Sequence, residues 1–195
     1  KYTDSVTLLG DTTLSGSTIT TGSTVTGGGK SLTVSGNAVV QGAISGVSSY
    51  LVSGTTSLGA NVTTTGSQTY TGPVTLARSV MLESTGGGAV TFSDTLASAP
   101  SLASGLTVST TGTTTFNGNV GGALGGVAAL GSLTVGAGPI VIRASLVNTS
   151  GSIGQTYGGA VKLGSNVWIN SGDASTAGPV TFSSTVDALG SPVNL

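Results

Sequence analysis

The chain has 195 residues, enough for one domain with a continuous core. Gly, Thr and Ser occur 34, 33 and 29 times and make up about half of it, yet 37% of the residues are hydrophobic and only 6% are charged. Disordered segments are usually poor in hydrophobic residues and rich in net charge, so this composition excludes a disordered linker. A net charge of −1 with five dispersed Lys and Arg residues leaves no basic patch for nucleic acid.

Hydrophobic residues alternate with polar ones in short segments along the chain. Examples in chain order are "SLTV" at 31–34, "PVTL" at 73–76 and "AVTF" at 89–92. Alternation with period two, with Thr on the polar side, is typical of a half-buried β-strand. Thr, Ser and Gly are poor helix formers, and no segment has hydrophobic residues at helical spacing. We therefore expect an all-β fold.

Four-residue segments of this kind recur at a nearly regular distance. They begin at Pro73, Ala89, Thr113, Pro139, Ala160 and Pro179, with a mean spacing of about 21 residues. A repeat of this length is typical of solenoids. We predict a right-handed parallel β-helix (β-solenoid) that occupies residues 1–195 as a single segment, with coils of about 20 residues. A β-sandwich or irregular barrel is the alternative, but the chain has few aromatic residues for a sandwich core and few hairpin turns.

The alternation also predicts which side chains face the core. The expected inward residues are Val74, Leu76, Val90, Phe92, Val161, Leu163, Val180 and Phe182. The expected outward residues include Thr33, Thr75, Thr91, Thr107, Thr134 and Thr181, which would form rows along one wall. Flat arrays of Thr bind ice in some solenoids, so ice binding is an alternative function. The uneven spacing of the segments is unfavourable for it.

Two phrases return later in the chain with changed charges. "SQTYTGPVTL" at 67–76 returns as "GQTYGGAVKL" at 154–163, and "GAVTFSDTL" at 88–96 returns as "GPVTFSSTV" at 178–186. The hydrophobic residues are kept, whereas Glu83 of the first copy corresponds to Asn170 of the second. Repetition that discards the ionisable residues indicates an architectural role.

The residue types that carry most catalysis are scarce. The chain has no His and no Cys, and its six carboxylates are Asp4, Asp11, Glu83, Asp94, Asp173 and Asp187. A polysaccharide-cleaving solenoid needs two or three carboxylates on neighbouring coils, and none recurs between the copies. We interpret Asp94 and Asp187 as residues that cap turns or strand ends. "TGGGKS" at 26–31 lacks the strand–loop–helix context of a phosphate loop. We therefore expect no enzyme, no catalytic residue, no metal and no cofactor, and a polysaccharide-active β-helix is the least favoured function.

One aromatic residue is a candidate for a surface contact. In "NVWIN" at 166–170, Trp168 would point outward between the inward Val167 and Ile169, and its counterpart in the first copy is Met81. An exposed Trp can stack on a sugar or contact a neighbouring rod. The interpretation that we favour is that a corner loop covers it.

The phrases "TTTGSQTYTGPVTL", "LTVSTTGTTTFNGNVGG" and "GPVTFSSTVDA" resemble repeats of filamentous-haemagglutinin-like exoproteins and autotransporter adhesins, very large surface proteins of Gram-negative bacteria. The resemblance covers most of residues 54–195 and is weaker over 1–53. It implies a right-handed parallel β-helix, export across the outer membrane, and a role in adhesion, biofilm or surface filaments.

From these observations we expect a structural stalk on the bacterial cell surface, taken from a longer protein. We expect no membrane span in this segment, because no hydrophobic run approaches the required length. The expected partners are further copies of the chain, end to end or laterally, and a host or matrix glycan or a neighbouring cell surface.

Overall fold

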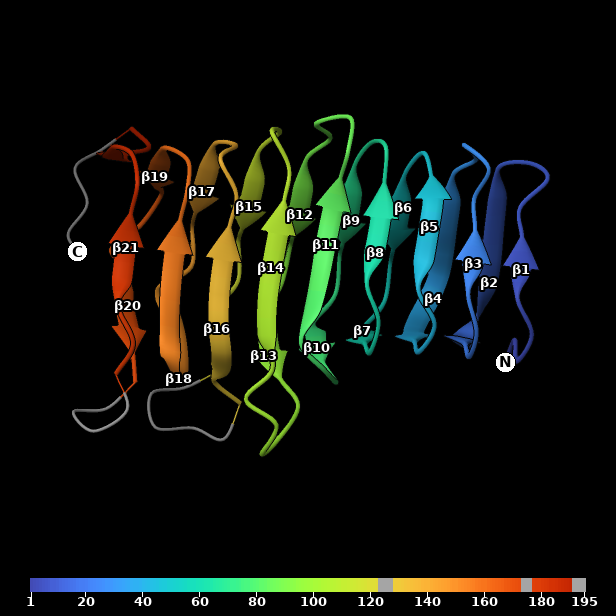
Figure 1. The fold of residues 1–195 in the computed structure, drawn as a ribbon, viewed down its shortest axis with the longest axis horizontal. Helices are drawn as coiled ribbons and strands as arrows, with labels where there is room; N and C mark the ends of the chain where they lie inside the picture. The colour runs from blue at the N-terminus through green and yellow to red at the C-terminus, as the bar shows by residue number, and fades with distance from the viewer. Residues whose placement is uncertain (123–127, 173–176, 191–195) are drawn as a thin grey trace.

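A computed structural model describes residues 1–122, 128–172 and 177–190 of the chain. In these residues the chain is a β-solenoid of about eight turns, with 22 β-strands and no helix (Figure 1). The named strands pair only in the parallel sense, each with strands of the neighbouring turns. The prediction of an all-β parallel solenoid is confirmed.

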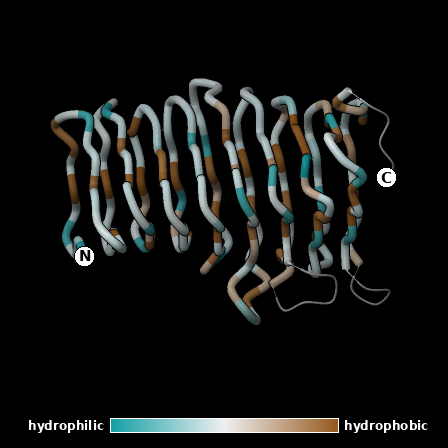
Figure 2. Tube along the Cα trace, turned by 180° about the vertical axis from the view of Figure 1, so that it is seen from behind, coloured by the Kyte–Doolittle hydropathy of each residue, from teal (hydrophilic) through white to brown (hydrophobic). Residues whose placement is uncertain are grey.

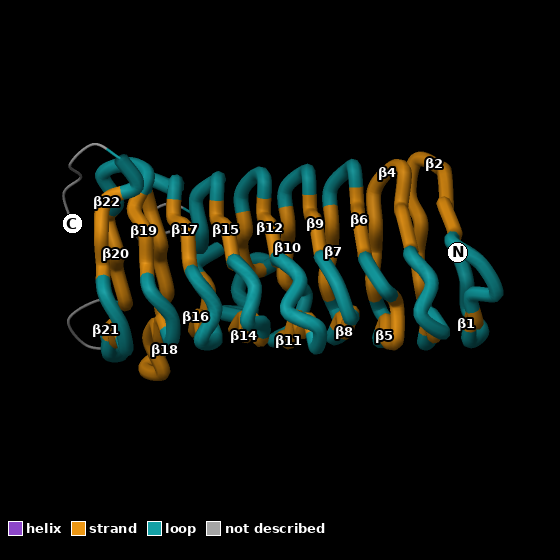
Figure 3. Tube along the Cα trace, turned by 90° about the horizontal axis from the view of Figure 1, so that it is seen from above, coloured by secondary structure: helices purple, strands orange, loops and turns teal. Residues whose placement is uncertain are grey.

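Each turn passes over three faces. The first face holds β1 (Val6–Thr7), β3 (Val25–Thr26), β5 (Ile44–Val47), β8 (Val62–Thr64), β11 (Val80–Ser84), β14 (Gly105–Ser109), β16 (Leu130–Val135), the second half of β18 (Leu146–Tyr157) and β21 (Val180–Phe182). The second face holds the first halves of β2 (Thr12–Thr21) and β4 (Leu32–Val40), then β6 (Tyr50–Val52), β9 (Gln68–Tyr70), β12 (Val90–Phe92), β15 (Thr114–Phe116), β17 (Ile140–Ile142), β19 (Val161–Leu163) and β22 (Val186–Ala188). The third face holds the second halves of β2 and β4, then β7 (Thr56–Leu58), β10 (Val74–Leu76), β13 (Leu96–Ser98), the first half of β18 and β20 (Trp168–Ser171). Figure 3 shows the second-face strands in one row and the first-face strands in another.

The winding is right-handed, as the sequence predicts. In Figure 1 the first-face strands run upward at the front, and the chain returns behind them while it advances from right to left. Eight pairings lead along the first face from Val6 to Phe182, which gives a mean of 22 residues per turn, close to the expected 20. The eight pairings join nine first-face strands, and we number the turns one to nine by these strands.

The core is a continuous column of hydrophobic side chains. Figure 2 shows hydrophobic segments recurring on successive turns. On the second face, Tyr50, Tyr70, Phe92 and Phe116 occupy consecutive turns, with ring centroids 5.3 to 6.0 Å apart. Each fully buried side chain of this size stabilises the fold by roughly 1.5–3 kcal/mol. Six of the eight expected inward residues are buried, as predicted: Val74, Leu76, Val90, Phe92, Val161 and Leu163.

The other two expected inward residues are not buried. Val180 is 39% exposed and Phe182 is only half-buried. The ring of Phe182 stacks on Tyr157 with centroids 4.9 Å apart, but β21 has a described partner strand on one side only. The alternation correctly predicts that both side chains point inward. Their full burial would require a further turn on the other side of β21.

The four-residue segments do not occupy equivalent places in the turns, which corrects the sequence interpretation. The segment at Pro73 lies on the third face, those from Ala89 to Ala160 lie on the second, and that at Pro179 lies on the first. Some intervals between segments therefore cover a whole turn, whereas the first and the last interval end on a different face. This difference explains part of the uneven spacing.

The repeated phrases lie on different faces for the same reason. Gln68 and Tyr70 of the first copy lie on the second face, whereas Gln155 and Tyr157 of the second copy lie on the first. In both copies the Tyr hydroxyl donates a hydrogen bond to the Gln oxygen, over 3.0 and 2.6 Å. In both, the Gln amide nitrogen donates to the backbone carbonyl of the residue 15 positions later in the chain, Glu83 and Asn170 respectively. The repeated unit is thus a strand, a corner and a strand, and it fits more than one corner.

Candidate functional site

The described carboxylates lie apart from one another. On the first face, the strand partners of Glu83 are Thr63 and Ser109, and on the second face the partner of Asp187 is Lys162. Within residues 1–122, 128–172 and 177–190, no group of three His, Cys, Asp or Glu side chains is arranged to hold a metal ion. Asp173 lies outside the described residues.

Several of the polar corner residues bind backbone groups. The Asp94 carboxylate accepts a hydrogen bond from the backbone N–H of Thr95 over 2.6 Å, as the capping interpretation predicts. Asp11 accepts one from the N–H of Ser31 on the next turn over 2.8 Å, and this bond is the main cause that lowers the pKa of its carboxyl. Such contacts stabilise the corners.

The Thr residues expected on one wall are distributed over all three faces, which corrects that expectation. Thr33 and Thr91 lie on the second face, and Thr75 lies on the third. On the first face, one uninterrupted row occupies the last four described turns: Thr107, Thr134, Thr156 and Thr181.

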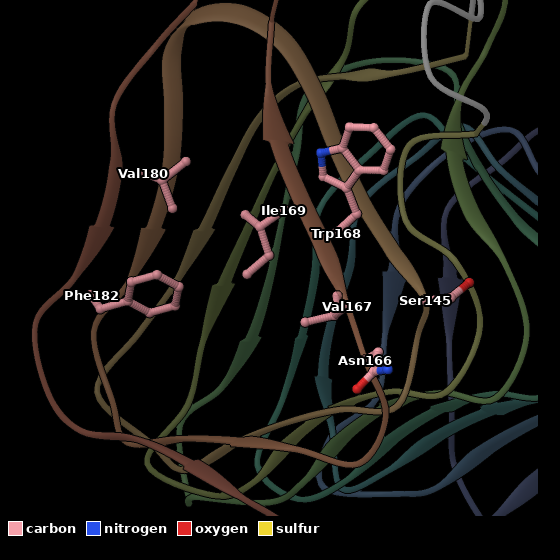
Figure 4. A pocket seen from close by; sticks show the side chains of 7 residues that line it. All are labelled: Ser145, Asn166, Val167, Trp168, Ile169, Val180 and Phe182. Atoms are coloured by element: carbon pink, nitrogen blue, oxygen red, sulfur yellow. The ribbon is translucent and has the colours of Figure 1, made fainter. Parts of the chain in front are cut away.

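Trp168 lies on the third face of turn eight and points outward, as predicted. Its side chain is 62% exposed, so the expectation that a corner loop covers it is wrong. Figure 4 shows its indole on the opposite side of the strand from Val167 and Ile169, which point toward Val180 and Phe182. Those four hydrophobic side chains line a hollow at the open end of the core.

A groove lies on the third face beside Trp168. It has a volume of about 580 Å³, and we call it the third-face groove; its lining residues are Thr95, Ala97, Asn119, Gly122, Ser145, Leu146 and Trp168. Four of them follow the long axis of the solenoid. Val120 bridges to Leu96 and Val147, and Leu146 pairs with Trp168. The residues just before these positions, Thr95, Asn119, Leu146 and Trp168, therefore form one column over turns five to eight.

At turn six the described residues depart from regular strand pairing on this face. Val120 forms an isolated bridge and is followed by Gly121 and Gly122, both with positive φ. Further along, Ala128 accepts a hydrogen bond from the Ser98 N–H, and Leu130, at the start of β16, pairs with Thr149. The small Ala97 and the absence of a side chain at Gly122 leave the floor low between Thr95 and Trp168.

Asn119 has a fixed orientation in this groove. Its side-chain oxygen accepts hydrogen bonds from the backbone N–H groups of Ser145 and Leu146, over 3.0 and 3.2 Å, and from the Ser145 hydroxyl over 3.0 Å. Because the oxygen is fully used, the amide nitrogen is the group that Asn119 can offer to a ligand. The sequence indicates Trp168 as a candidate but not Thr95, Asn119 or Ser145, since only the stacking of turns brings these residues together.

No family model, no curated protein and no solved structure matches this chain. In the residues that the structure describes, no helix is long and hydrophobic enough to span a membrane.

Proposed function

We propose that this chain is a rigid spacer within a secreted or cell-surface bacterial filament or adhesin. The observation that carries the proposal is the parallel stack of the first and second faces, which runs through every described turn and in which the registered strands hydrogen-bond to the turns above and below. Such a stack resists bending and pulling because many backbone hydrogen bonds and the core column connect each turn to the next. The described ionisable residues, which are dispersed, support a mechanical role over a catalytic one.

The location of the protein is the second part of the proposal. The repeats resemble those of filamentous-haemagglutinin-like exoproteins and autotransporter adhesins, whose stalks lie outside the cell. The absence of Cys from the sequence suits a long chain that must stay unfolded during export. Antibodies against this chain should therefore label intact cells that express the whole protein. Labelling only after the cells are permeabilised would contradict the location.

The spacer function is tested by a distance measurement between spin labels. The chain has no Cys, so Thr13→Cys and Lys162→Cys create two unique labelling sites. Both positions point outward on the second face and are seven turns apart. At about 4.8 Å per turn, their backbones are separated by roughly 34 Å.

A rigid spacer gives one narrow distance distribution near this value in electron paramagnetic resonance. The pair Thr13→Cys and Leu51→Cys, two turns apart, serves as the control for the width contributed by the labels. A distribution for the long pair that is much broader than that of the control contradicts a rigid spacer.

Ice binding is a second candidate, favoured by the Thr row on the first face. The outward neighbours of Thr134 are Ser132 and Gly136, and those of Thr156 are Gly154 and Gly158, so each turn presents a single Thr. An ice-binding face needs two Thr residues per turn at constant spacing. We therefore expect no thermal hysteresis in a freezing assay, and measurable hysteresis that Thr156→Val abolishes would favour ice binding over the spacer.

A further inference from the structure

We propose that the third-face groove binds a short neutral oligosaccharide. The inference does not depend on the spacer function, since a groove on the side of a rod can act whether or not the rod bears load. It is carried by three features of the groove: an exposed indole, an oriented amide and the absence of charge.

The groove has the shape of a site for a linear molecule. Thr95, Asn119, Leu146 and Trp168 belong to four consecutive turns, so the column extends over three turn spacings, or about 14 Å. Its volume of about 580 Å³ lies within the usual range of ligand sites. A chain of a few sugar rings can lie along the axis, with successive rings over successive turns.

Trp168 provides the stacking surface. An aromatic ring has a negative face and attracts the weakly positive C–H groups of a pyranose, while the flat contact removes hydrophobic area from water. The indole belongs to a strand of regular parallel pairing with β18, which holds its backbone in place. Leu146, half-buried on the neighbouring turn, extends the hydrophobic floor beside it.

The polar groups of the groove suit hydroxyl groups. Asn119 offers an oriented N–H donor, and the Thr95 hydroxyl can donate or accept. The Ser145 hydroxyl, whose hydrogen binds Asn119, can accept. A hydrocarbon or lipid chain in the same place would cover these groups without pairing them, which costs about 1–3 kcal/mol for each.

The charge of the groove selects among polar ligands. None of its seven lining residues is ionisable. Anionic polysaccharides and nucleic acids would find no cation to pair with their acidic groups, and peptides with charged side chains would gain no ion pair. A neutral oligosaccharide fulfils the requirements for stacking, hydrogen bonding and charge together.

Intrinsic fluorescence gives a direct assay, because Trp168 is the single Trp of the chain. The 195-residue protein is titrated with neutral hexamers of β-1,4-linked glucose, β-1,4-linked N-acetylglucosamine and α-1,4-linked glucose. We expect a saturable change in Trp emission with at least one of them and none with an oligogalacturonate of equal length. If no neutral hexamer gives a saturable change at millimolar concentration, or if the anionic one binds better, the proposal is wrong.

Three variants assign the binding to the groove by calorimetry. Trp168→Ala should weaken it by more than about tenfold. Asn119→Asp keeps the oxygen that orients the side chain but removes the N–H donor, and should weaken it by about tenfold with an unchanged circular dichroism spectrum. Met81→Ala, at the corresponding outward position of the first copy, lies outside the groove and should bind as the parent does. Unchanged affinity in Trp168→Ala, or a loss in Met81→Ala equal to that in Trp168→Ala, would overturn the assignment.

Discussion

At the scale of single residues, the core is not entirely hydrophobic, because two fully buried glutamines lie in it. Gln68 donates hydrogen bonds to the carbonyl oxygens of Val62 and Glu83 and accepts one from Tyr70. Gln155 has the same arrangement with Asn170 and Tyr157. A buried amide is tolerated only when its partners are present. The phrase "QTY" is therefore kept in both copies because its two polar side chains satisfy each other.

Removing the Tyr hydroxyl should show how much the buried Gln depends on its hydrogen bond. In Tyr70→Phe the side-chain oxygen of Gln68 loses its donor without access to water, so we expect a loss of about 1–2 kcal/mol in the free energy of unfolding. Tyr157→Phe should behave alike. Urea unfolding monitored by circular dichroism measures the loss. Tyr2→Phe, at a side chain that is 40% exposed, is the control and should change the free energy by less than about 0.5 kcal/mol.

The buried tyrosines should also make the fold sensitive to alkali. Burial raises the pKa of Tyr50, Tyr70 and Tyr157 above the ordinary value of about 10, because the phenolate loses its hydration in the core. Their contribution to stability is complete below pH 10, where both the folded and the unfolded states are protonated. Above pH 10 the unfolded chain releases protons that the folded chain retains. Stability should then fall by up to about 1.4 kcal/mol per pH unit for each Tyr.

Urea midpoints at intervals from pH 8 to pH 12 test the alkaline loss. We expect a flat profile up to about pH 10 and a steep decline above it. The Tyr70→Phe variant, compared with itself at pH 8, should decline less steeply, since one titrating group is gone. A parent profile that begins to fall well below pH 9, or an equal slope in the variant, would contradict this assignment.

At the scale of strands and corners, close stacking requires glycine at particular places. Gly121, directly after Val120, has a φ of 83° and is buried, and a Cβ atom there would overlap the carbonyl oxygen of Asn148 on the next turn. Gly29 has a similar φ of 79°, but no atom lies within 4 Å of the corresponding Cβ position. The two glycines share a backbone conformation and differ in the space around them.

Substitution of Gly29 and of Gly121 by Ala separates the cost of backbone strain from the cost of steric overlap. Gly29→Ala should cost roughly 1–2 kcal/mol, from the left-handed conformation alone. Gly121→Ala adds displacement of the neighbouring turn, and we expect a loss of roughly 3 kcal/mol or more. Thermal and urea unfolding of both variants give the two values. Equal losses would mean that the corner at Gly121 adapts without disturbing the turn above.

Some properties of the strands can be predicted from the sequence and others cannot. Strand type and inward direction follow from local alternation, so Val74 and Phe92 could be placed in the core without coordinates. The face that each strand occupies could not be predicted, because similar segments fit all three faces and the corners vary in length. The third-face groove depends on the isolated bridge at Val120 and on turns up to 73 residues apart, from Thr95 to Trp168. No local sequence pattern indicates that residues so far apart in the chain lie in one groove.

At the scale of the whole molecule, the two ends of the described rod differ from its middle. β1 has a described partner strand on one side only, and so do β21 and β22 at the other end. Free strand edges attract other strands, and the end near β21 also presents the hydrophobic hollow with Val180 and Phe182. Because the two ends are unlike, a contact between them is head to tail, and contacts of this kind along the axis of a straight rod build open filaments.

We therefore expect the chain to associate end to end as its concentration rises. The change Val180→Asp places a charge in the hollow, where docking would bury it without a partner, so association should weaken strongly. Thr181→Asp adds the same charge at the next residue, which points outward in the Thr row, and association should persist. Light scattering across a wide concentration range measures the mean mass of all three proteins. A parent chain that stays monomeric at the highest concentration contradicts end-to-end docking, and equal loss in both variants would locate the contact on the first face instead of the open end.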